Sequence, residues 1–288
     1  MHPPFEALVA EELSLDVDRR VTALAQAIAA KHGAASRAVL FYGSCLRTSQ
    51  LDGLMLDFYL IVTDYRSAYD QRWLARANAL VPPNVFPFEH DGLAAKYAVL
   101  SEEDFYRLNG PETRNVSVWA RFAQPARLVW THDQAAAGRT IAAVARAAPT
   151  LLDAAGRVAG EKPLDRWRRA FFLTYSAELR AERTGKSGSV VDCDRERYRR
   201  FFEPAVAAIE ARAGKGASWR RRRIEGKALS VVRLAKASAT FAGGIDYIAW
   251  KINRHAGTRI VIKPWQRHHP LLAAISLLPR LLRSGAVR

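Results

Sequence analysis

The sequence is poor in cysteine and has no long apolar run. Cys45 and Cys193 are its only cysteines, too few for a disulfide framework, which favours a reducing compartment. Its most apolar stretches, such as residues 271–278, are far shorter than the roughly 20 residues of a membrane-spanning helix. The N-terminal segment lacks the basic-then-apolar pattern of a signal peptide and is too acidic for a transit peptide. We therefore expect a cytoplasmic protein without a transmembrane segment.

Acidic residues become scarce in the second half of the chain. Residues 1–135 carry 13 Lys and Arg against 16 Asp and Glu, a net charge of −3. Residues 136–288 carry 31 against 12, a net charge of +19. This asymmetry indicates a polyanionic partner: nucleic acid, an anionic membrane or a phosphorylated substrate.

The first half has the pattern of a mixed α and β domain. Apolar runs predict strands at residues 37–42, 54–62 and 126–130. A hairpin is expected over residues 84–100, because Asp91-Gly92 is a strong signal for a two-residue turn. A capping box at Ser101 and Asp104 predicts the start of a helix. Further helices are predicted at residues 16–32 and 67–80.

The second half reads as helical. Apolar residues at helical spacing between Gly and Pro boundaries predict helices at residues 135–160, 163–183, 194–214, 218–241 and 244–257. A short strand at 258–263 and an amphipathic helix after residue 270 are also expected. We therefore expect two domains, residues 1–135 and 136–288, the second basic and mainly helical.

Asp57 is a carboxylate in the middle of a predicted apolar strand. A buried carboxylate without a partner costs several kcal/mol, so Asp57 needs a hydrogen-bonding group or a metal ion. The Gly43-Ser44 turn ends the preceding strand and offers backbone N–H groups and a hydroxyl to a phosphate. Two interpretations stay open for Asp57: a carboxylate held by an arginine or by backbone amides, and a metal ligand.

The predicted hairpin places a second carboxylate near an ammonium group. With Asp91-Gly92 as the turn, Glu89 lies opposite Ala94 and Pro87 lies opposite Lys96. Glu89 and Lys96 are then diagonal neighbours on one face. They fit a further metal ligand and a phosphate-binding cation, or a surface ion pair.

The turn and the strand carboxylate together resemble the nucleotidyltransferase superfamily of the DNA polymerase β type. In that superfamily the Gly-Ser turn holds a nucleoside triphosphate, and strand carboxylates hold Mg²⁺ between its phosphates. The resemblance implies that Tyr42, Gly43 and Ser44 bind the nucleotide and that Asp57 binds the metal.

The superfamily pattern has a second acidic residue two positions after the first, where this sequence has Tyr59. The second carboxylate is therefore expected from Glu89 across the sheet or from Asp52 in the loop, and Glu89 is preferred.

Several segments together resemble one branch of the superfamily: the mitochondrial translocator-assembly-and-maintenance type of phosphatidate cytidylyltransferase and its bacterial relatives. They are FYGSCLRTSQ (41–50), LMLDFYLIVTDY (54–65), AKYAVLSEEDF (95–105), VWARFAQPARLVW (118–130) and a basic C-terminal stretch. In this branch too the strand reads Asp-Phe without a second acidic residue. The resemblance implies an α+β fold, with a mixed-sheet nucleotidyltransferase domain followed by the basic helical domain.

The resemblance also implies a reaction. The phosphate of phosphatidate would attack the α-phosphorus of CTP, giving CDP-diacylglycerol and pyrophosphate with Mg²⁺ as cofactor. Asp57 would hold the metal and Lys96 would offset phosphate charge. Positioning and charge neutralisation dominate such a reaction, because a phosphate monoester is already a charged nucleophile.

A lipid substrate implies a peripheral position on the inner face of a membrane. Basic residues attract anionic head groups, and a terminal amphipathic helix can lie in the interface or pack on the core. The expected contacts with the substrate or the membrane are Arg221, Arg222, Lys227, Arg233, Arg280 and Arg283.

Two alternative functions remain open. One is a nucleotidyltransferase acting on RNA or on a small-molecule acceptor, although the aromatic residues of the second half fall on apolar helix faces rather than on a base-reading surface. The other is a catalytically inactive fold that serves as a binding module, which the residue at position 59 favours. The oligomeric state is left open.

Overall fold

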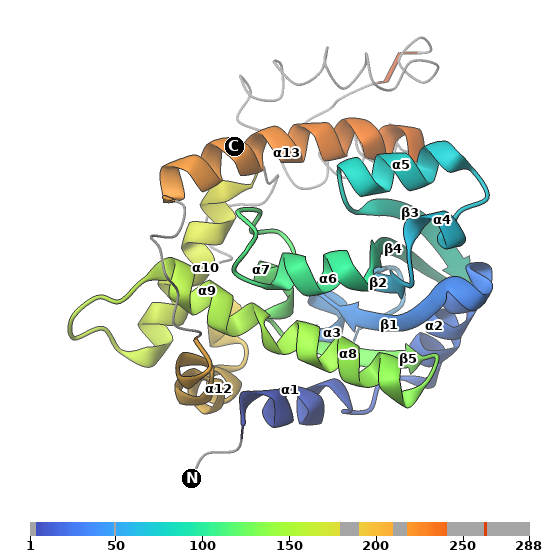
Figure 1. Ribbon diagram of the computed structural model, residues 1–288. Helices are drawn as coiled ribbons and strands as arrows, with labels where there is room; N and C mark the ends of the chain where they lie inside the picture. Colours follow the sequence, from blue (N-terminus) through green and yellow to red (C-terminus); the bar gives the residue numbers. More distant parts are fainter. Residues whose placement is uncertain (1–3, 49, 179–189, 210–217, 241–261, 264–288) are drawn as a thin grey trace.

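The structure is a computed structural model that describes residues 4–48, 50–178, 190–209, 218–240 and 262–263 (Figure 1). These residues form an α+β fold, as the sequence predicts, with one five-stranded mixed sheet and many helices. The strands are β1 (Ser36–Tyr42), β2 (Met55–Val62), β3 (Asn84–His90), β4 (Leu93–Ser101) and β5 (Ala126–Thr131). They lie in the order β3-β4-β2-β1-β5, in which β2 and β4 are parallel and the other neighbours are antiparallel.

Helices surround this sheet. They are α1 (Phe5–Leu13), α2 (Arg19–Lys31), α3 (Ser44–Thr48), α4 (Tyr65–Ala68), α5 (Arg72–Leu80), α6 (Glu102–Asn109), α7 (Trp119–Phe122), α8 (Gln134–Ala145), α9 (Ala147–Ala155), α10 (Pro163–Ala177), α12 (Arg195–Ala207) and α13 (Trp219–Thr240). Within the described ranges, no helix is both long enough and apolar enough to span a bilayer.

Local sequence signals set several of these boundaries. The side chains of Asp18, Ser101 and Asp133 each accept a hydrogen bond from a backbone N–H group in the first turn of α2, α6 and α8. The hairpin prediction is confirmed: Asp91 and Gly92 form the turn between β3 and β4, both with positive φ (48° and 75°).

Other boundaries differ from the predictions. Residues 67–80, predicted as one helix, form the end of α4 and then α5, because Tyr69 has extended backbone (φ −135°). Residues 135–160, also predicted as one helix, contain α8 and α9. Helix α1 was not predicted. The predictions for residues 244–257 and for the terminal helix, with Arg280 and Arg283, fall outside the described residues.

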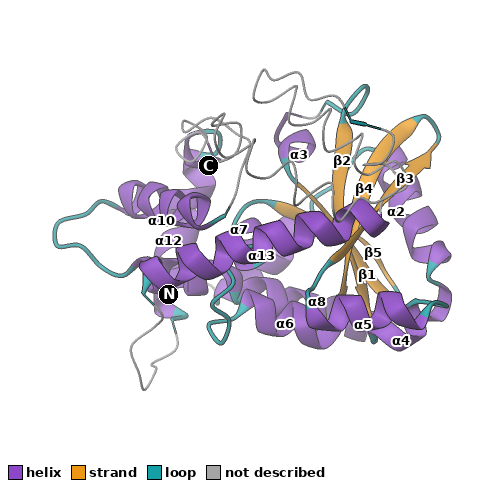
Figure 2. Ribbon diagram, turned by 90° about the horizontal axis from the view of Figure 1, so that it is seen from above, coloured by secondary structure: helices purple, strands orange, loops and turns teal. Residues whose placement is uncertain are grey.

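Apolar side chains cover both faces of the sheet. One face carries Leu40 and Tyr59 and packs against α1, α6 to α10 and α12. The other carries Phe41 and Phe58 and packs mainly against α2. Figure 2 shows the strands with α2 on one side and α6 and α8 on the other. The first core runs from Phe5 to helices of the second half, so the described parts of both halves share it, and the expected boundary at residue 135 falls inside α8.

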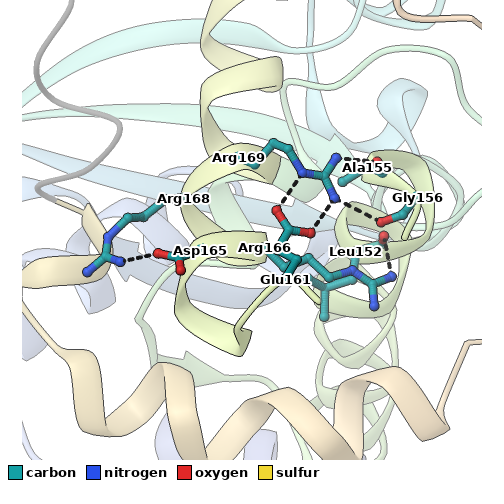
Figure 3. A network of polar contacts seen from close by, with 8 residues as sticks. All are labelled: Leu152, Ala155, Gly156, Glu161, Asp165, Arg166, Arg168 and Arg169. Carbon is teal, nitrogen blue, oxygen red and sulfur yellow. Dashed lines mark hydrogen bonds and ion pairs between the residues drawn. The ribbon is translucent and has the colours of Figure 1, made fainter. Parts of the chain in front are cut away.

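Many arginines of the second half hold this fold together. At the start of α10, Arg169 binds both carboxylate oxygens of Glu161 at 2.7 Å and donates to the carbonyl oxygen of Ala155 at 2.6 Å (Figure 3). The buried Arg166 donates to the carbonyl oxygen of Leu152 at 3.0 Å. These arginines cap the end of α9 and tie it to α10, so the net charge of this half is not all available to a partner.

Candidate functional site

A row of side chains crosses the sheet where β1 ends and β2 begins. Tyr42 on β1 pairs with Asp57 on β2, Asp57 pairs with Lys96 on β4, and Lys96 pairs with Pro87 on β3. Directly paired residues point to the same face of a sheet. The parallel pairing of β2 with β4 therefore brings together residues that are far apart in the chain.

Asp57 and Lys96 form the central ion pair of this row. The Lys96 Nζ lies 2.8 Å from Asp57 Oδ1. The exposed fraction is 24% for the Lys96 side chain and 20% for the Asp57 side chain. The pair is thus partly shielded from water, where charges interact more strongly than at a free surface, yet a ligand can still reach both groups. The partner that Asp57 needed is a lysine, not the arginine or the backbone amides considered from the sequence.

Gly43 lets the backbone approach the other oxygen of this carboxylate. Its φ is +96°, and a Cβ atom at this position would lie 2.9 Å from Asp57 Oδ2. Only glycine combines this backbone conformation with so close an approach. The turn and the strand carboxylate, linked on sequence grounds alone, are therefore in direct contact. Ser44 is exposed and begins the short helix α3.

A tyrosine and an arginine lie behind the ion pair. Burial raises the pKa of Tyr42 well above its usual value, the Asp57 charge raises it further, and Arg121 opposes both effects. Burial lowers the pKa of Arg121, but Tyr59, Tyr42 and other acidic groups, Asp57 among them, raise it overall. Tyr42 thus stays a neutral phenol and Arg121 a fixed cation near the carboxylate.

A second arginine joins Arg121 from α13. Arg121 Nη1 donates to the carbonyl oxygen of Ser117 at 2.7 Å, and Arg233 Nη1 donates to the Ser117 hydroxyl at 2.7 Å. Arg233 Nε and Nη2 also donate to the carbonyl oxygen of Pro82 at 2.9 and 2.6 Å. Arg233, expected to contact substrate or membrane, instead links α13 to the segment before β3. Arg121 was not singled out from the sequence, where it is one arginine among apolar residues.

Lys236 completes the link between α13 and the sheet. Its Nζ donates to the carbonyl oxygens of Val81 and Pro83. Burial, together with the charge of Arg233, lowers the pKa of Lys236 to about 7. Arg233 and Lys236 on the buried side of α13 are therefore held by the segment between α5 and β3.

The two expected further carboxylates do not join Asp57. Glu89 pairs with Ala94 and lies on the same face as Asp57, but it is exposed and β4 separates the two strands. Asp52 accepts a hydrogen bond from Arg20 Nη1 at 2.9 Å on the surface. Across the part of the chain that the structure describes, no group of three or more His, Cys, Asp or Glu residues is placed to hold a metal ion.

The basic residues expected to contact a partner divide into buried and exposed ones. Arg222 is buried and donates to the carbonyl oxygen of Arg114 at 2.9 Å. Arg221 lies on the surface, where its Nε binds Glu225 at 2.9 Å. Lys227 is exposed.

Neither the family models nor the curated proteins contain a match to this sequence. A carboxylate, an ammonium group and a glycine turn meet at one point, with Arg121 behind them. Such a set can bind an anionic group through its cations and a divalent cation through its carboxylate.

Proposed function

We propose that the protein is a phosphatidate cytidylyltransferase that transfers CMP from CTP to phosphatidate at a membrane surface. The observation that carries the proposal is the contact of Asp57 with both Lys96 and the Gly43 turn. This contact joins the three motifs on which the resemblance to nucleotidyltransferases rests. It puts the expected metal ligand, phosphate-binding cation and triphosphate-binding turn within one site.

The residues present fit a Mg²⁺ ion bound together with a nucleotide. Mg²⁺ is commonly held by one or two carboxylates, with substrate phosphates and water as its other ligands. Asp57 would supply that carboxylate, and the bound ion would draw negative charge from the phosphate oxygens. Lys96 would then be released from Asp57 to bind phosphate oxygens.

The remaining chemistry is positioning and charge neutralisation. A phosphate oxygen of phosphatidate forms a bond to the α-phosphorus of CTP, and the bond from that phosphorus to the bridging oxygen breaks, releasing pyrophosphate. Lys96 and Arg121 offset the charge that accumulates on the phosphates, and the Gly43-Ser44 backbone holds the triphosphate. No protein base is required, because the nucleophile is already an anion.

The test is incubation of the full-length protein with labelled CTP, Mg²⁺ and phosphatidate. A labelled lipid and pyrophosphate are expected, and their absence over a range of pH and metal concentration would contradict the proposal. Asp57→Asn should lower the rate at least about 100-fold, the usual loss for one electrostatic contact to a transition state. Asp16→Asn, a change to an exposed carboxylate outside the site, is the matched control.

The same assay addresses the second carboxylate. We expect Glu89→Gln to lower the activity more than Asp52→Asn, because Glu89 shares the face of Asp57 whereas Asp52 binds Arg20. A larger loss of activity in Asp52→Asn than in Glu89→Gln would indicate that Asp52, in the loop before β2, is the second metal ligand.

One observation favours a second candidate, a binding module without catalytic activity. Tyr59, at the second acidic position of the superfamily pattern, is a buried core residue that packs against Phe122 with ring centroids 5.1 Å apart. Binding of CTP without any labelled product from lipid, RNA or small-molecule acceptors would favour this module. A labelled RNA or small molecule in place of lipid would favour the other alternative.

A further inference from the structure

Helix α5 exposes a stripe of basic and large apolar residues. Its buried side chains, Ala75 and Asn78, face the sheet. Its solvent side carries Arg72 and Arg76 together with Trp73 and Leu80, whose exposed fractions are 49% and 80%. The helix contains no acidic residue. The solvent side of α5 therefore combines two cations with a tryptophan and a leucine and carries no negative charge.

Helix α13 exposes a similar stripe. Arg220, Arg223 and Lys227 are exposed at spacings of three to four residues and so lie on one side of the helix. Ile224, with an exposed fraction of 63%, lies on the same side, and Val232, with an exposed fraction of 47%, lies at the edge between this side and the buried one. The opposite side carries the residues that hold the protein core and the segment before β3.

The two helices are connected through the segment that follows α5. Figure 1 places α5 near the C-terminal part of α13, and both helices contact strand β3. Arg233 and Lys236 of α13 bind the carbonyl oxygens of Val81, Pro82 and Pro83, which directly follow α5. This link fixes the position of one helix against the other, and we call their two exposed stripes together the α5–α13 face.

We propose that the α5–α13 face docks on an anionic lipid bilayer. Tryptophan and aliphatic side chains enter the boundary between head groups and acyl chains, while arginine and lysine beside them bind anionic head groups. An RNA backbone would use the cations but would leave the leucine, isoleucine and valine in contact with water. The mixture of residue types therefore selects a bilayer over a nucleic acid.

This inference deepens the proposed function, on which its biological purpose rests, and it changes which residues make the membrane contact. Of the residues expected from the sequence, Lys227 lies on this face, whereas Arg222 and Arg233 face inwards. Arg280 and Arg283 of the terminal helix lie outside the described residues. The described residues instead offer α5 and the outer side of α13, beside the strand that carries Pro87 of the site row.

The experiment measures binding without nucleotide, so that it does not depend on catalysis. Full-length protein is floated with vesicles of phosphatidylcholine and phosphatidylglycerol, and with pure phosphatidylcholine vesicles. We expect capture by the anionic vesicles that weakens as salt is raised. The variant R72Q/R76Q/R220Q/R223Q should bind at least 100-fold more weakly, because each basic residue near the surface contributes roughly a fivefold factor.

Two matched variants separate this face from general charge and apolarity. R19Q/R157Q/K162Q/R199Q removes the same charge from exposed positions elsewhere and should change vesicle binding less than threefold. Trp73→Ser with Leu80→Ser should weaken binding at least tenfold, whereas Leu15→Ser, at another exposed leucine, should not.

The proposal is overturned if the face variant binds vesicles as well as the parent protein does, or if the control variant loses as much. Capture of a single-stranded RNA oligonucleotide by the same face, with no capture by vesicles, would also overturn it. Vesicle binding through this face without any CTP-dependent product would leave the docking surface standing and reject the enzymatic proposal.

Discussion

At the scale of single residues, Gly43 carries two constraints that can be separated by mutation. Gly43→Ala should destabilise the protein by about 1–3 kcal/mol, since its φ of +96° is unfavourable for alanine. It should also impair the site, because the added methyl group would press on Asp57 Oδ2 at 2.9 Å. Urea unfolding measures the first effect and nucleotide binding the second.

Gly53→Ala is the matched control for this change. Gly53 also has a positive φ (+71°), but a Cβ atom there would meet nothing within 4 Å. It should lose stability without losing nucleotide affinity. Equal loss of affinity in both variants would show that backbone strain, and not contact with Asp57, explains the effect.

Lys96 is the second residue whose role can be isolated. Lys96→Met keeps much of the apolar stem and removes the ammonium group 2.8 Å from Asp57. We expect the rate of the proposed cytidylyl transfer to fall about 10²–10³-fold. Lys31→Met, which removes an exposed ammonium over the Phe88 ring, is the control. If Lys96→Met kept the rate of the parent protein, Lys96 would have no role in the proposed reaction.

The site was predictable residue by residue but not as an arrangement. Gly43, Ser44 and Asp57 could be chosen because a small-residue turn and a strand carboxylate are local signals. The pairing of Asp57 with Lys96 depends on β2 and β4 being parallel neighbours, which no short-range pattern encodes. Arg121 lay beyond sequence reasoning for the same reason, since its importance comes from Tyr42 and Ser117.

At the scale of elements, strands and capped helices were predicted well, and breaks between helices were not. Continuous apolar runs and the Asp91-Gly92 turn fix strands through local geometry. The break between α4 and α5 arises instead from tertiary contacts. Asn78 of α5 donates to Tyr69 and to the carbonyl oxygen of Val99, both at 3.0 Å, and thereby holds the turn against β4.

A partly buried histidine, His32, joins the end of α2 to the same region and predicts a pH dependence of stability. His32 Nδ1 lies 2.9 Å from the carbonyl oxygen of Ala68, so it donates, and Nε2, 3.1 Å from the Tyr97 oxygen, accepts. Burial lowers the pKa of His32 below its usual 6.5; the Ala68 carbonyl and Asp70 oppose this, and Lys31 adds to it. The folded protein is therefore more stable when the His32 ring is neutral than when it is protonated.

The sign of the effect follows from that lowered pKa. Below pH 6.5 the unfolded chain binds a proton that the folded protein resists, so the free energy of unfolding should fall as the pH falls. The slope from one group is at most about 1.4 kcal/mol per pH unit. His32→Gln should flatten the dependence seen in urea unfolding between pH 7 and 5, whereas His132→Gln, at an exposed position, should not. Parallel curves for the parent protein and His32→Gln would contradict this assignment.

At the scale of the whole molecule, a buried ion pair joins the first helix, α1, to α12 in the second half of the chain. Arg197 of α12 binds both carboxylate oxygens of Glu12 in α1 and donates to the carbonyl oxygen of Ala123 at 3.1 Å. Arg197→Met should cost about 3–5 kcal/mol, because Glu12 is left charged in a site where it keeps only 14% of its exposure. The measurement is urea unfolding.

The neighbouring pair of Arg200 and Glu11 supplies the control. It joins the same two helices, but its side chains remain 48% and 58% exposed. Arg200→Met should change stability by less than about 1 kcal/mol. Adding Glu12→Gln to Arg197→Met should recover part of the loss, and no recovery would assign the cost to packing on Phe201 and not to the unpaired charge.

The net charge of the second half also takes on a different meaning once the contacts are known. Arg166, Arg169, Arg197, Arg222 and Arg233 all donate to backbone carbonyl oxygens. The amino-acid composition alone does not distinguish these arginines, which bind backbone carbonyl oxygens, from basic residues that are exposed. Some of the exposed ones lie on α13, and this distribution, rather than the total charge, supports the proposed docking face.

Pro87, opposite Lys96 in the site row, has a consequence for the behaviour of the protein at high concentration. Strand β3 is the last strand of the sheet among the described residues, and strands at a sheet edge are the ones to which a strand from another molecule can add. Proline has no N–H group, so β3 lacks one of the donors that an incoming strand would need. The outer end of the row thereby protects the sheet against aggregation by strand addition.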